Sequence, residues 1–289
     1  MEKVAFIGLG VMGYPMAGHL ARAGYKTTVY NRTGGKADTW GTEFGGTVAA
    51  TPREAATGAE VVFACVGNDD DIRSVVYGDD GILSGMQEGA VLVDHTTASP
   101  ALARELESAL EGAGCGFLDA PVSGGQAGAE NGQLTIMVGG RQAPFDTSSR
   151  IMEVYAKSVR LMGPSGSGQL TKAVNQICIA GILQGLSEGL HFAEQVGLDI
   201  NAVVEVISKG AAQSWQMENR ADTMAEGKFD FGFAVDWMRK DLGIALDTAD
   251  DVEASLPLTA LVDQFYKDVQ RMGGGRWDTS SLIERLRDG

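Results

Sequence analysis

A single lysine near the start of a long, otherwise uncharged helical stretch is the side chain of this sequence best suited to proton transfer. Lys172 lies in the segment Gly168–Gln176 among apolar residues, and no acidic residue lies within one helical turn of it. A lysine fixed in apolar surroundings loses the solvation of its ammonium group, so its pKa falls and it can exchange protons. Asn175 follows one turn later on the same helical face, where its amide suits either a neutral hydrogen-bonding surface or a substrate contact. The alternative is a structural lysine that snorkels to solvent or pairs with a distant carboxylate.

A glycine-rich turn close to the N-terminus is typical of dinucleotide binding. It matches the pattern G-x-G-x-x-G directly after an expected strand and directly before an expected helix. The first glycine permits the tight turn, the second lets the backbone approach a pyrophosphate, and the third lets the helix pack close to the strand. The start of the helix then offers unpaired N–H groups to the phosphates. A glycine turn without a ligand is the alternative. The residues of this cofactor turn are Gly8, Leu9, Gly10, Val11, Met12 and Gly13.

The end of the second expected strand indicates which nucleotide is bound. Enzymes that prefer NAD usually place an acidic residue about twenty residues after the glycine turn, where it binds the ribose hydroxyls. This chain has Asn31, Arg32 and Thr33 instead, which can donate hydrogen bonds to a 2′-phosphate, and a guanidinium suits phosphate in particular. We therefore expect NADP as the preferred cofactor, with NAD also accepted. The alternative is that Arg32 is a solvated loop charge that stacks on adenine.

Up to residue 164 the chain alternates short β-type runs with helical stretches. Such alternation predicts βαβ units and a parallel sheet buried on both faces, an α/β Rossmann-type domain. The expected strands are Val4–Ile7, Thr27–Tyr30, Val61–Val66, Val91–Asp94, Phe117–Leu118, Leu134–Val138 and Val159–Met162. The expected helices are Met12–Ala23, Asp70–Tyr77, Pro100–Glu111 and Ala143–Tyr155.

After a break rich in turn formers, residues 163–168, the pattern becomes entirely helical. One long helix is expected over Gln169–Val196, where Gly181, Gly185 and Gly189 form a stripe that suggests a close helix–helix crossing. The sequence thus predicts two domains: residues 1–164 bind the dinucleotide, and residues 165–289 form an all-helical domain, joined through the long helix, for substrate binding and oligomerisation. Its further helices are expected over Asn201–Ser208, Trp215–Glu226, Val235–Asp250, Pro257–Arg271 and Ser280–Arg287, with no strand.

Composition argues against several other classes of protein. The formal charge of −15 disfavours nucleic acid and anionic membranes as partners, and no apolar stretch of about 18 residues is available to span a bilayer. Cys65, Cys115 and Cys178 are odd in number, widely spaced and set in apolar runs. We expect them to be small buried residues in a reducing compartment, with neither disulfides nor a metal site. Because the chain begins without a signal peptide, a cytoplasmic location is expected.

Four separated motifs resemble the β-hydroxyacid dehydrogenase family, which includes 3-hydroxyisobutyrate dehydrogenase, tartronate semialdehyde reductase and the glyoxylate and succinic semialdehyde reductases. They are the glycine turn Gly8–Gly13, the segment Asp119–Gly125, the lysine segment Gly168–Gln176 and the run Lys240–Leu242. The resemblance covers nearly the whole chain. It implies an NADP(H)-dependent oxidoreductase that interconverts a small carboxylate-bearing aldehyde and its hydroxyacid. It also implies a homodimer or homotetramer of two-domain subunits, with the active site in the cleft between the domains.

The resemblance also implies roles for individual residues. Lys172 would be the general acid that protonates the aldehyde oxygen as hydride arrives from the nicotinamide, and its charge would stabilise the developing alkoxide. Lys240 would contact cofactor or substrate, although taken alone it is a solvated charge. Groups expected to bind the substrate carboxylate or hydroxyl are Ser123, Gly124, Gly125 and Asn175. Residues expected to border the cofactor at other strand ends are Val66, Gly67, Asn68 and Thr97.

Two places depart from the family pattern. His95 precedes Thr96 and Thr97 where members commonly carry small hydroxyl residues, and we interpret it as a strand-end residue and not as a catalyst. The segment Gly210–Trp215 falls where the family varies the residues that line the substrate pocket. Trp215 is therefore expected either as an aromatic wall of that pocket or as a core residue.

Other functions compete with this interpretation. An imine reductase shares the fold and cofactor but typically lacks the lysine. A histidine acid–base group, as in many 2-hydroxyacid dehydrogenases, is disfavoured because His19 and His191 lie in expected helices where packing explains them. A non-catalytic NADPH-binding scaffold predicts loss of Lys172 or of the turn after Ser123, and both are intact.

Overall fold

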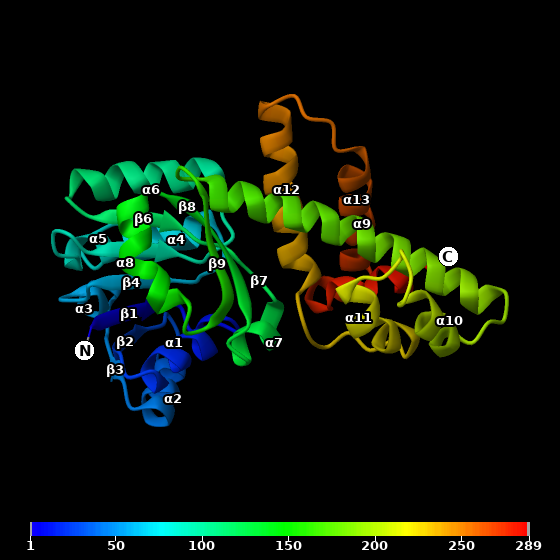
Figure 1. Cartoon of the computed structure of the whole chain (residues 1–289), viewed down its shortest axis with the longest axis horizontal. Helices are drawn as coiled ribbons and strands as arrows, with labels where there is room; N and C mark the ends of the chain where they lie inside the picture. Colours follow the sequence, from blue (N-terminus) through cyan, green and yellow to red (C-terminus); the bar gives the residue numbers. More distant parts are fainter. Residues whose placement is uncertain (1, 288–289) are drawn as a thin grey trace. The chain divides into compact units, whose positions relative to one another are not determined.

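The computed structural model describes residues 2–287 and divides the chain into two compact units, one up to Lys172 and one from Ala173 onwards. The division falls within helix α9 (Ser167–Gln195). Unit 1 combines a sheet with helices, and unit 2 is helical (Figure 1). The expected fold class, a Rossmann-type α/β part followed by a helical part, is confirmed.

Six parallel strands form the main part of the sheet in unit 1. They run in the order β3-β2-β1-β4-β5-β6, so the winding direction changes between β1 and β4, the place where open α/β sheets bind ligands. Their bounds are β1 (Lys3–Ile7), β2 (Lys26–Tyr30), β3 (Thr47–Val48), β4 (Val61–Ala64), β5 (Val91–Asp94) and β6 (Gly116–Asp119).

The rest of the sheet departs from the expected parallel arrangement. Strand β8 (Leu134–Gly140) runs antiparallel to β6 and to β7 (Val122–Ser123), and β9 (Ala156–Gly163) is parallel to β8. The physical reason lies in the short connection between β7 and β8. It consists of little more than the helix α7 (Gly125–Glu130), whereas a parallel crossover needs about a dozen residues or more. The chain therefore turns back on itself here.

Alternate residues of the central strands contribute to two separate cores. On one face Val4 and Phe6 of β1 pack with α1, α2 and α8; on the other, Ala5 and Ile7 pack with α3, α4, α5 and α6. Helices on both faces explain why these strands are continuous apolar runs (Figure 1). The helices are α1 (Gly13–Arg22), α2 (Gly34–Phe44), α3 (Pro52–Ala56), α4 (Asp69–Val76), α5 (Ile82–Gly85), α6 (Pro100–Gly112) and α8 (Gln142–Met152).

Several elements of unit 1 are not evident from the sequence: β3, β7, α2, α3, α5 and α7. Helix α2 is instructive because it begins with Gly34 and Gly35, which are poor helix formers. Tertiary packing stabilises it: Trp40 is fully buried, and its indole N–H donates to the backbone oxygen of Tyr14 at 3.2 Å. The other five are shorter than most elements that sequence patterns can detect.

Unit 2 is built around the second part of α9. Its other elements are α10 (Ile200–Ile207), α11 (Trp215–Ala225), α12 (Val235–Asp251), α13 (Pro257–Arg271), the 3-10 turns η1 (Gly274–Arg276) and η2 (Thr279–Ile283), and α14 (Glu284–Arg287). The expected helix Ser280–Arg287 is thus wrong in its first half. There the buried Asp278 carboxylate accepts the N–H and hydroxyl of Ser280 and the N–H of Phe233, which holds the tighter turn.

Two expectations about α9 are wrong. Gly185 and Gly189 are exposed, and a Cβ at either position would meet no atom within 4 Å; only Gly181 has a close neighbour, Leu258. The stripe is therefore no close crossing within this chain. Cys178 is exposed, whereas Cys115 is buried, because Cys178 lies on the outer face of α9. No helix within residues 2–287 is long and apolar enough to cross a membrane.

His95 joins the ends of two strands to the core, as its interpretation as a strand-end residue implies. Its Nδ1 lies 2.6 Å from the backbone oxygen of Ala120 and its Nε2 lies 2.9 Å from the hydroxyl of Tyr155. The imidazole also stacks on Phe63. Burial lowers the pKa of His95 to about 4 because a charged ring would lose its hydration.

We expect this histidine to make the protein less stable in mild acid. A pKa below the unfolded value contributes stability that is fully present above pH 6.5 and is lost as the pH falls towards 4, by at most roughly 3 kcal/mol. Urea unfolding at pH 7 and pH 5 should show a steeper loss for the wild type than for His95→Gln. Asp94, whose pKa burial raises to about 7, acts in the opposite direction but is present in both proteins. Equal losses would contradict a buried neutral His95.

Candidate functional site

The three glycines of the cofactor turn differ in whether the surrounding chain requires a glycine at their position. Gly8 has a φ of +96°, and a Cβ there would lie 2.3 Å from the backbone oxygen of Cys65. A Cβ at Gly13 would lie 2.0 Å from the oxygen of Gly8. Both positions therefore admit glycine alone, for the turn and for the approach of α1 to the strand. A Cβ at Gly10 would meet nothing within 4 Å.

The open space at Gly10 fits a dinucleotide. No atom of the chain requires glycine there, so the position leaves room for a ligand to approach the backbone. Helix α1 begins beside it without a side-chain cap and without an acidic residue in its first turn. Its first N–H groups and the positive end of its dipole thus suit a pyrophosphate. Leu9 is buried, Val11 is exposed and Met12 is the N-cap residue.

Asn31 supports the turn from the end of β2. Its side-chain oxygen accepts the N–H of Leu9 at 2.8 Å, and its amide donates to the backbone oxygen of Thr33 at 3.0 Å. Asn31 therefore orders the glycine turn and the loop after β2 together. This use of its amide was not foreseen from the sequence, which indicates a phosphate contact.

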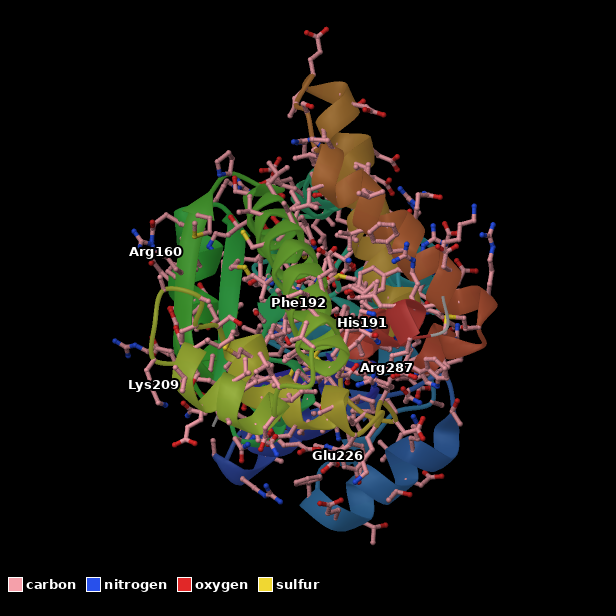
Figure 2. The ribbon with its side chains drawn as sticks, turned by 90° about the vertical axis from the view of Figure 1, so that its right-hand side faces the viewer. Arg160, His191, Phe192, Lys209, Glu226 and Arg287 are labelled. Carbon is pink, nitrogen blue, oxygen red and sulfur yellow. The ribbon has the colours of Figure 1, made fainter. Side chains whose placement is uncertain are left out.

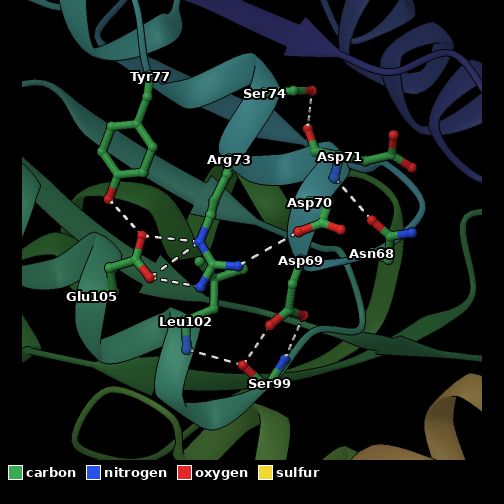
Figure 3. A network of polar contacts seen from close by, with 10 residues as sticks. All are labelled: Asn68, Asp69, Asp70, Asp71, Arg73, Ser74, Tyr77, Ser99, Leu102 and Glu105. Atoms are coloured by element: carbon green, nitrogen blue, oxygen red, sulfur yellow. Dashed lines mark hydrogen bonds and ion pairs between the residues drawn. The ribbon is translucent and has the colours of Figure 1, made fainter.

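Arg32 forms an ion pair that the sequence does not reveal. Its Nη1 lies 3.0 Å from Oδ1 of Asp71, while 84% of the arginine side chain remains exposed. Asp71 belongs to the first turn of α4, where its backbone N–H donates to the side chain of Asn68 (Figure 3). In the same turn, Asp69 accepts the N–H and hydroxyl of Ser99. The loop after β2 is thus held electrostatically to the start of α4.

The carboxyl ends of β1, β4 and β5 lie at one edge of the sheet because these strands are parallel neighbours. The loop after β4 contains Val66, Gly67 and Asn68, and the loop after β5 contains Thr97. The N–H of Val66 donates to the hydroxyl of Thr96 at 3.0 Å, which connects the two loops. Together with the glycine turn after β1, these loops form the edge at which α/β folds bind nucleotides.

The turn after Ser123 lies on the antiparallel side of the sheet. Ser123 ends β7 and pairs with Thr135 of β8. Gly124 and Gly125 follow with φ values of +129° and +60°, which favour glycine, and both are exposed. The turn is therefore a backbone structure that glycine specifically permits, at the start of α7.

Lys172 is buried, with 7% of its surface exposed. The residues that share its face of α9 are polar: Gln169 and Gln176 are 2% and 1% exposed. Leu170 and Val174 point outwards, at 37% and 61% exposed. The apolar surroundings inferred from neighbouring residues are thus wrong in detail, because those neighbours lie on the opposite face of the helix. The burial of the lysine nevertheless agrees with a functional amine.

The start of α9 is fixed to unit 1 through Asp119, at the end of β6. The two oxygens of this buried carboxylate accept the N–H groups of Gly166 and Gln169, at 2.7 and 2.9 Å. Burial raises the pKa of Asp119, and the backbone N–H groups oppose that rise. A Cβ at Gly168 would lie 2.4 Å from the oxygen of Met137, so the helix approaches the sheet closely.

In unit 2, Asn175 and Lys240 belong to one polar network. Asn175 donates to Gln176 at 2.8 Å, and Gln176 donates to Oδ2 of Asp241 at 2.8 Å. The ammonium of Lys240 lies 3.1 Å from Oδ1 of the same carboxylate. The structure therefore joins two predicted site residues that are 65 positions apart, and Lys240 is no freely solvated charge.

Trp215 is not a core residue. It is 51% exposed at the start of α11, and the guanidinium of Arg220 lies over its ring at 5.0 Å. The core alternative is thus wrong, while its place in a substrate pocket stays a prediction.

Comparison with known proteins supports one family for both parts of the chain. Residues 3–163 match the model of the NAD binding domain of 6-phosphogluconate dehydrogenase. Residues 166–286 match the model described as the NAD-binding domain of NADP-dependent 3-hydroxyisobutyrate dehydrogenase. The chain belongs to the β-hydroxyacid dehydrogenase family. As a member of this family, it is an NAD(P)-dependent oxidoreductase.

Relatives extend over almost the full length of this β-hydroxyacid dehydrogenase. An uncharacterised oxidoreductase of Shewanella frigidimarina is 64% identical over 99% of this chain and 98% of its own length. The 2-hydroxy-3-oxopropionate reductase of Escherichia coli is 34% identical over 98% and 97%. Among solved structures, Psf3 in complex with NADP+ and 2-OPP has a TM-score of 0.90 at 26% identity, over 98% of this chain and 99% of its own.

Five residues of these networks were missed from the sequence: Asp71, Asp119, Gln169, Gln176 and Asp241. Asp119, Gln169, Gln176 and Asp241 all lie inside segments that resemble the family, but their role as buried hydrogen-bonding partners depends on contacts between distant segments. For Gln169 a signal was available, since it lies three residues before Lys172 and so shares its face of the helix. Asp71 lies 39 residues from Arg32, and no local pattern connects the two.

The glycine turn allows a paired test in this β-hydroxyacid dehydrogenase. Gly10→Ala should leave the unfolding midpoint unchanged, because its methyl group would enter open space, but weaken NADPH and NADH about tenfold or more, because we expect the pyrophosphate to occupy that space. Gly13→Ala should lower the unfolding midpoint itself, since its methyl group would overlap Gly8. Calorimetry of the free protein and nucleotide titration distinguish the two effects. Unimpaired nucleotide binding by Gly10→Ala would contradict the assigned site.

Proposed function

We propose that this enzyme interconverts a small carboxylate-bearing aldehyde, of the semialdehyde or glyoxylate type, and the corresponding hydroxyacid, with Lys172 as general acid and base. The observation that carries the proposal is the buried amine of Lys172 on a helix whose start is hydrogen-bonded to the loop after β5. That loop lies at the nucleotide-binding edge of the sheet. The reductase activity named for the Escherichia coli relative agrees with this reaction class.

The proposed chemistry needs one charged donor. Bound NADPH supplies the hydride. The ammonium of Lys172 donates a proton to the carbonyl oxygen as negative charge develops there, and the neutral amine takes it back in the reverse direction. Because Lys172 is buried, water competes little with the substrate oxygen for its protons, which strengthens the interaction.

We propose that the substrate carboxylate binds the turn formed by Ser123, Gly124 and Gly125. The serine hydroxyl and the backbone N–H groups of a glycine turn are donors that suit a carboxylate. Asn175 and Lys240 of unit 2 would supply further contacts to substrate, and Lys240 to cofactor as well. In support, Asn175 donates a partly buried hydrogen bond to Gln176 and Lys240 forms an ion pair with Asp241, and a buried hydrogen bond joins Gln176 to Asp241. Trp215 would line the pocket.

We further propose that NADP is preferred over NAD. The loop after β2 carries Arg32 and no acidic residue, which favours a 2′-phosphate. The Psf3 structure also contains NADP+. The ion pair with Asp71 works against this preference, because the carboxylate already neutralises the guanidinium and would repel the phosphate. The remaining cofactor contacts are proposed for the loops after β4 and β5.

A homo-oligomer is also proposed. Along the outer face of α9 in unit 2 an exposed stripe consists of small and apolar residues, namely Val174, Cys178, Ile182, Gly185, Gly189, Phe192 and Val196. Phe192 is 64% exposed and lies on the side of this unit that faces the viewer in Figure 2. Such a stripe is suited to contact a second copy. A mass of two or four times 30.3 kDa in light scattering would support the oligomer. A cytoplasmic location stays a prediction.

The substrate class and the lysine can be tested together. With NADPH, the wild type should reduce at least one of glyoxylate, succinic semialdehyde, tartronate semialdehyde and methylmalonate semialdehyde. Lys172→Ala should then lower kcat about 10²–10⁴-fold while nucleotide binding is retained, the usual effect of removing a positioned proton donor. Lys157→Ala, at an exposed lysine of unit 1, is the matched control. A loss below tenfold would remove Lys172 from its role.

Turnover of cyclic imines in place of the aldehydes would favour an imine reductase instead. No turnover of either class, with intact NADPH binding, would favour a non-catalytic scaffold or another substrate.

Two variants test the cofactor preference. Arg32→Ala should weaken NADPH at least tenfold more than NADH, because only NADPH carries the additional phosphate. Asp71→Asn should have the opposite effect and strengthen NADPH up to about fivefold, the scale of an exposed ion pair, with NADH unchanged. Fluorescence titrations with both nucleotides provide the measurement. Equal weakening of both nucleotides by Arg32→Ala would mean that Arg32 contacts only the adenine.

A further inference from the structure

Gln169 pairs with the backbone on both sides of Thr97. Its side-chain oxygen accepts the N–H of Ala98 at 3.1 Å, and its side-chain nitrogen donates to the oxygen of Thr96 at 2.7 Å. These are the donor and acceptor that a neighbouring strand would otherwise satisfy, but β5 has ended at Asp94. The side-chain amide of Gln169 thus makes the hydrogen bonds to the loop after β5 that the backbone of a neighbouring strand would otherwise make.

The hydrogen bonds of Gln169 with the loop after β5 are buried, and few other side chains could form both of them. Gln169 is 2% exposed, and its backbone N–H donates to Asp119, so the residue is held at both its main chain and its side chain. An asparagine is one methylene shorter and cannot reach both backbone groups from the same helix position. A glutamate keeps the acceptor for Ala98 but places a second acceptor against the oxygen of Thr96. Leucine has neither group.

Lys172 lies three residues further along α9, on the same face of the helix. A shift or rotation of the first turn of α9 therefore moves the lysine relative to the loop that contains Thr97. The helix backbone is anchored by Asp119, but that anchor lies at the end of β6 and binds the N–H groups of Gly166 and Gln169. Gln169 makes the direct connection between the helix and that loop.

We infer that Gln169 is a positioning residue, which fixes the distance and orientation of Lys172 relative to the loop after β5. This inference rests on the proposed function of Lys172. The effect of Gln169 is on the placement of the amine relative to this loop, so its loss should lower kcat far more than it weakens nucleotide binding, whose other contacts are proposed for the glycine turn and the loop after β4. Misplacement of a reacting group by about 1 Å can reduce a rate about 100-fold.

The test uses the full-length enzyme with Gln169→Leu, which has a similar volume and lacks both hydrogen-bonding groups. Thr27→Val is the matched control. It removes the partly buried hydrogen bond that the buried Thr27 donates to the oxygen of Tyr25 in the same unit, at the start of β2. We expect kcat to fall about 100-fold in Gln169→Leu, with KM within threefold of the wild type, the Kd of NADPH weakened less than tenfold and an unfolding midpoint similar to that of Thr27→Val. A kcat within threefold of the control variant would overturn the inference.

A second measurement is independent of turnover. Acetylation of Lys172 by acetic anhydride, followed by mass spectrometry with exposed Lys157 as internal reference, should proceed at least threefold faster in Gln169→Leu than in wild type. If the wild type reduces none of the aldehydes, the proposed function fails, and the labelling rate alone decides whether Gln169 holds the lysine. An unchanged labelling rate overturns the inference. Should Gln169→Leu not fold, Gln169→Asn replaces it with the same expected changes.

Discussion

The carboxylate of Asp119 is the contact on which the geometry of unit 1 most depends. It lies at the end of β6 and accepts two N–H groups from the start of α9. A buried carboxylate without such donors would be costly, and a helix start without an acceptor would leave N–H groups unsatisfied. The carboxylate and the N–H groups thus offset each other's desolvation cost. Because a helix N-terminus favours negative charge, the direction of α9 and the charge of Asp119 agree.

Close approach of main chains makes this contact feasible. A Cβ at Gly139 would lie 2.4 Å from Oδ1 of Asp119, and Gly168 is equally confined. The absence of side chains at these two positions lets β8, the end of β6 and the first turn of α9 lie against one another. Gln169 and Lys172 then follow in fixed positions on the inner face. The start of α9, which carries Lys172, is thereby held by backbone contacts, which vary less than side-chain packing does.

The fold class, the glycine turn and the burial of Lys172 could be predicted because their signals are local. The alternation of strands and helices, the glycine turn and the position of Lys172 are all properties of short segments. What could not be predicted depends on distant partners: the ion pair of Arg32 with Asp71, the network of Gln176 with Asp241, and the return of β8. The orientation of α9 was also missed. Periodicity suggests that apolar residues face inwards, but here Val174 is exposed and Gln169 is buried.

The helix α2 is another element that depends on distant partners and is not evident from local sequence. Two initial glycines disfavour it, and only the burial of Trp40 beneath α1 explains why it forms. Helix propensity alone is misleading here, because the free energy gained by burying one large aromatic side chain exceeds the free energy lost by placing two glycines in a helix.

The unequal demands on the glycines of the cofactor turn have an evolutionary consequence. Gly8 and Gly13 are required for the chain to adopt its shape at all, so folding alone is enough to preserve them in any descendant. Gly10 is under no such constraint from its own neighbours. A duplicated gene product that no longer binds the coenzyme could acquire a side chain at position 10 and still fold. The residue at that position would then distinguish copies that bind the coenzyme from copies that have lost this ability.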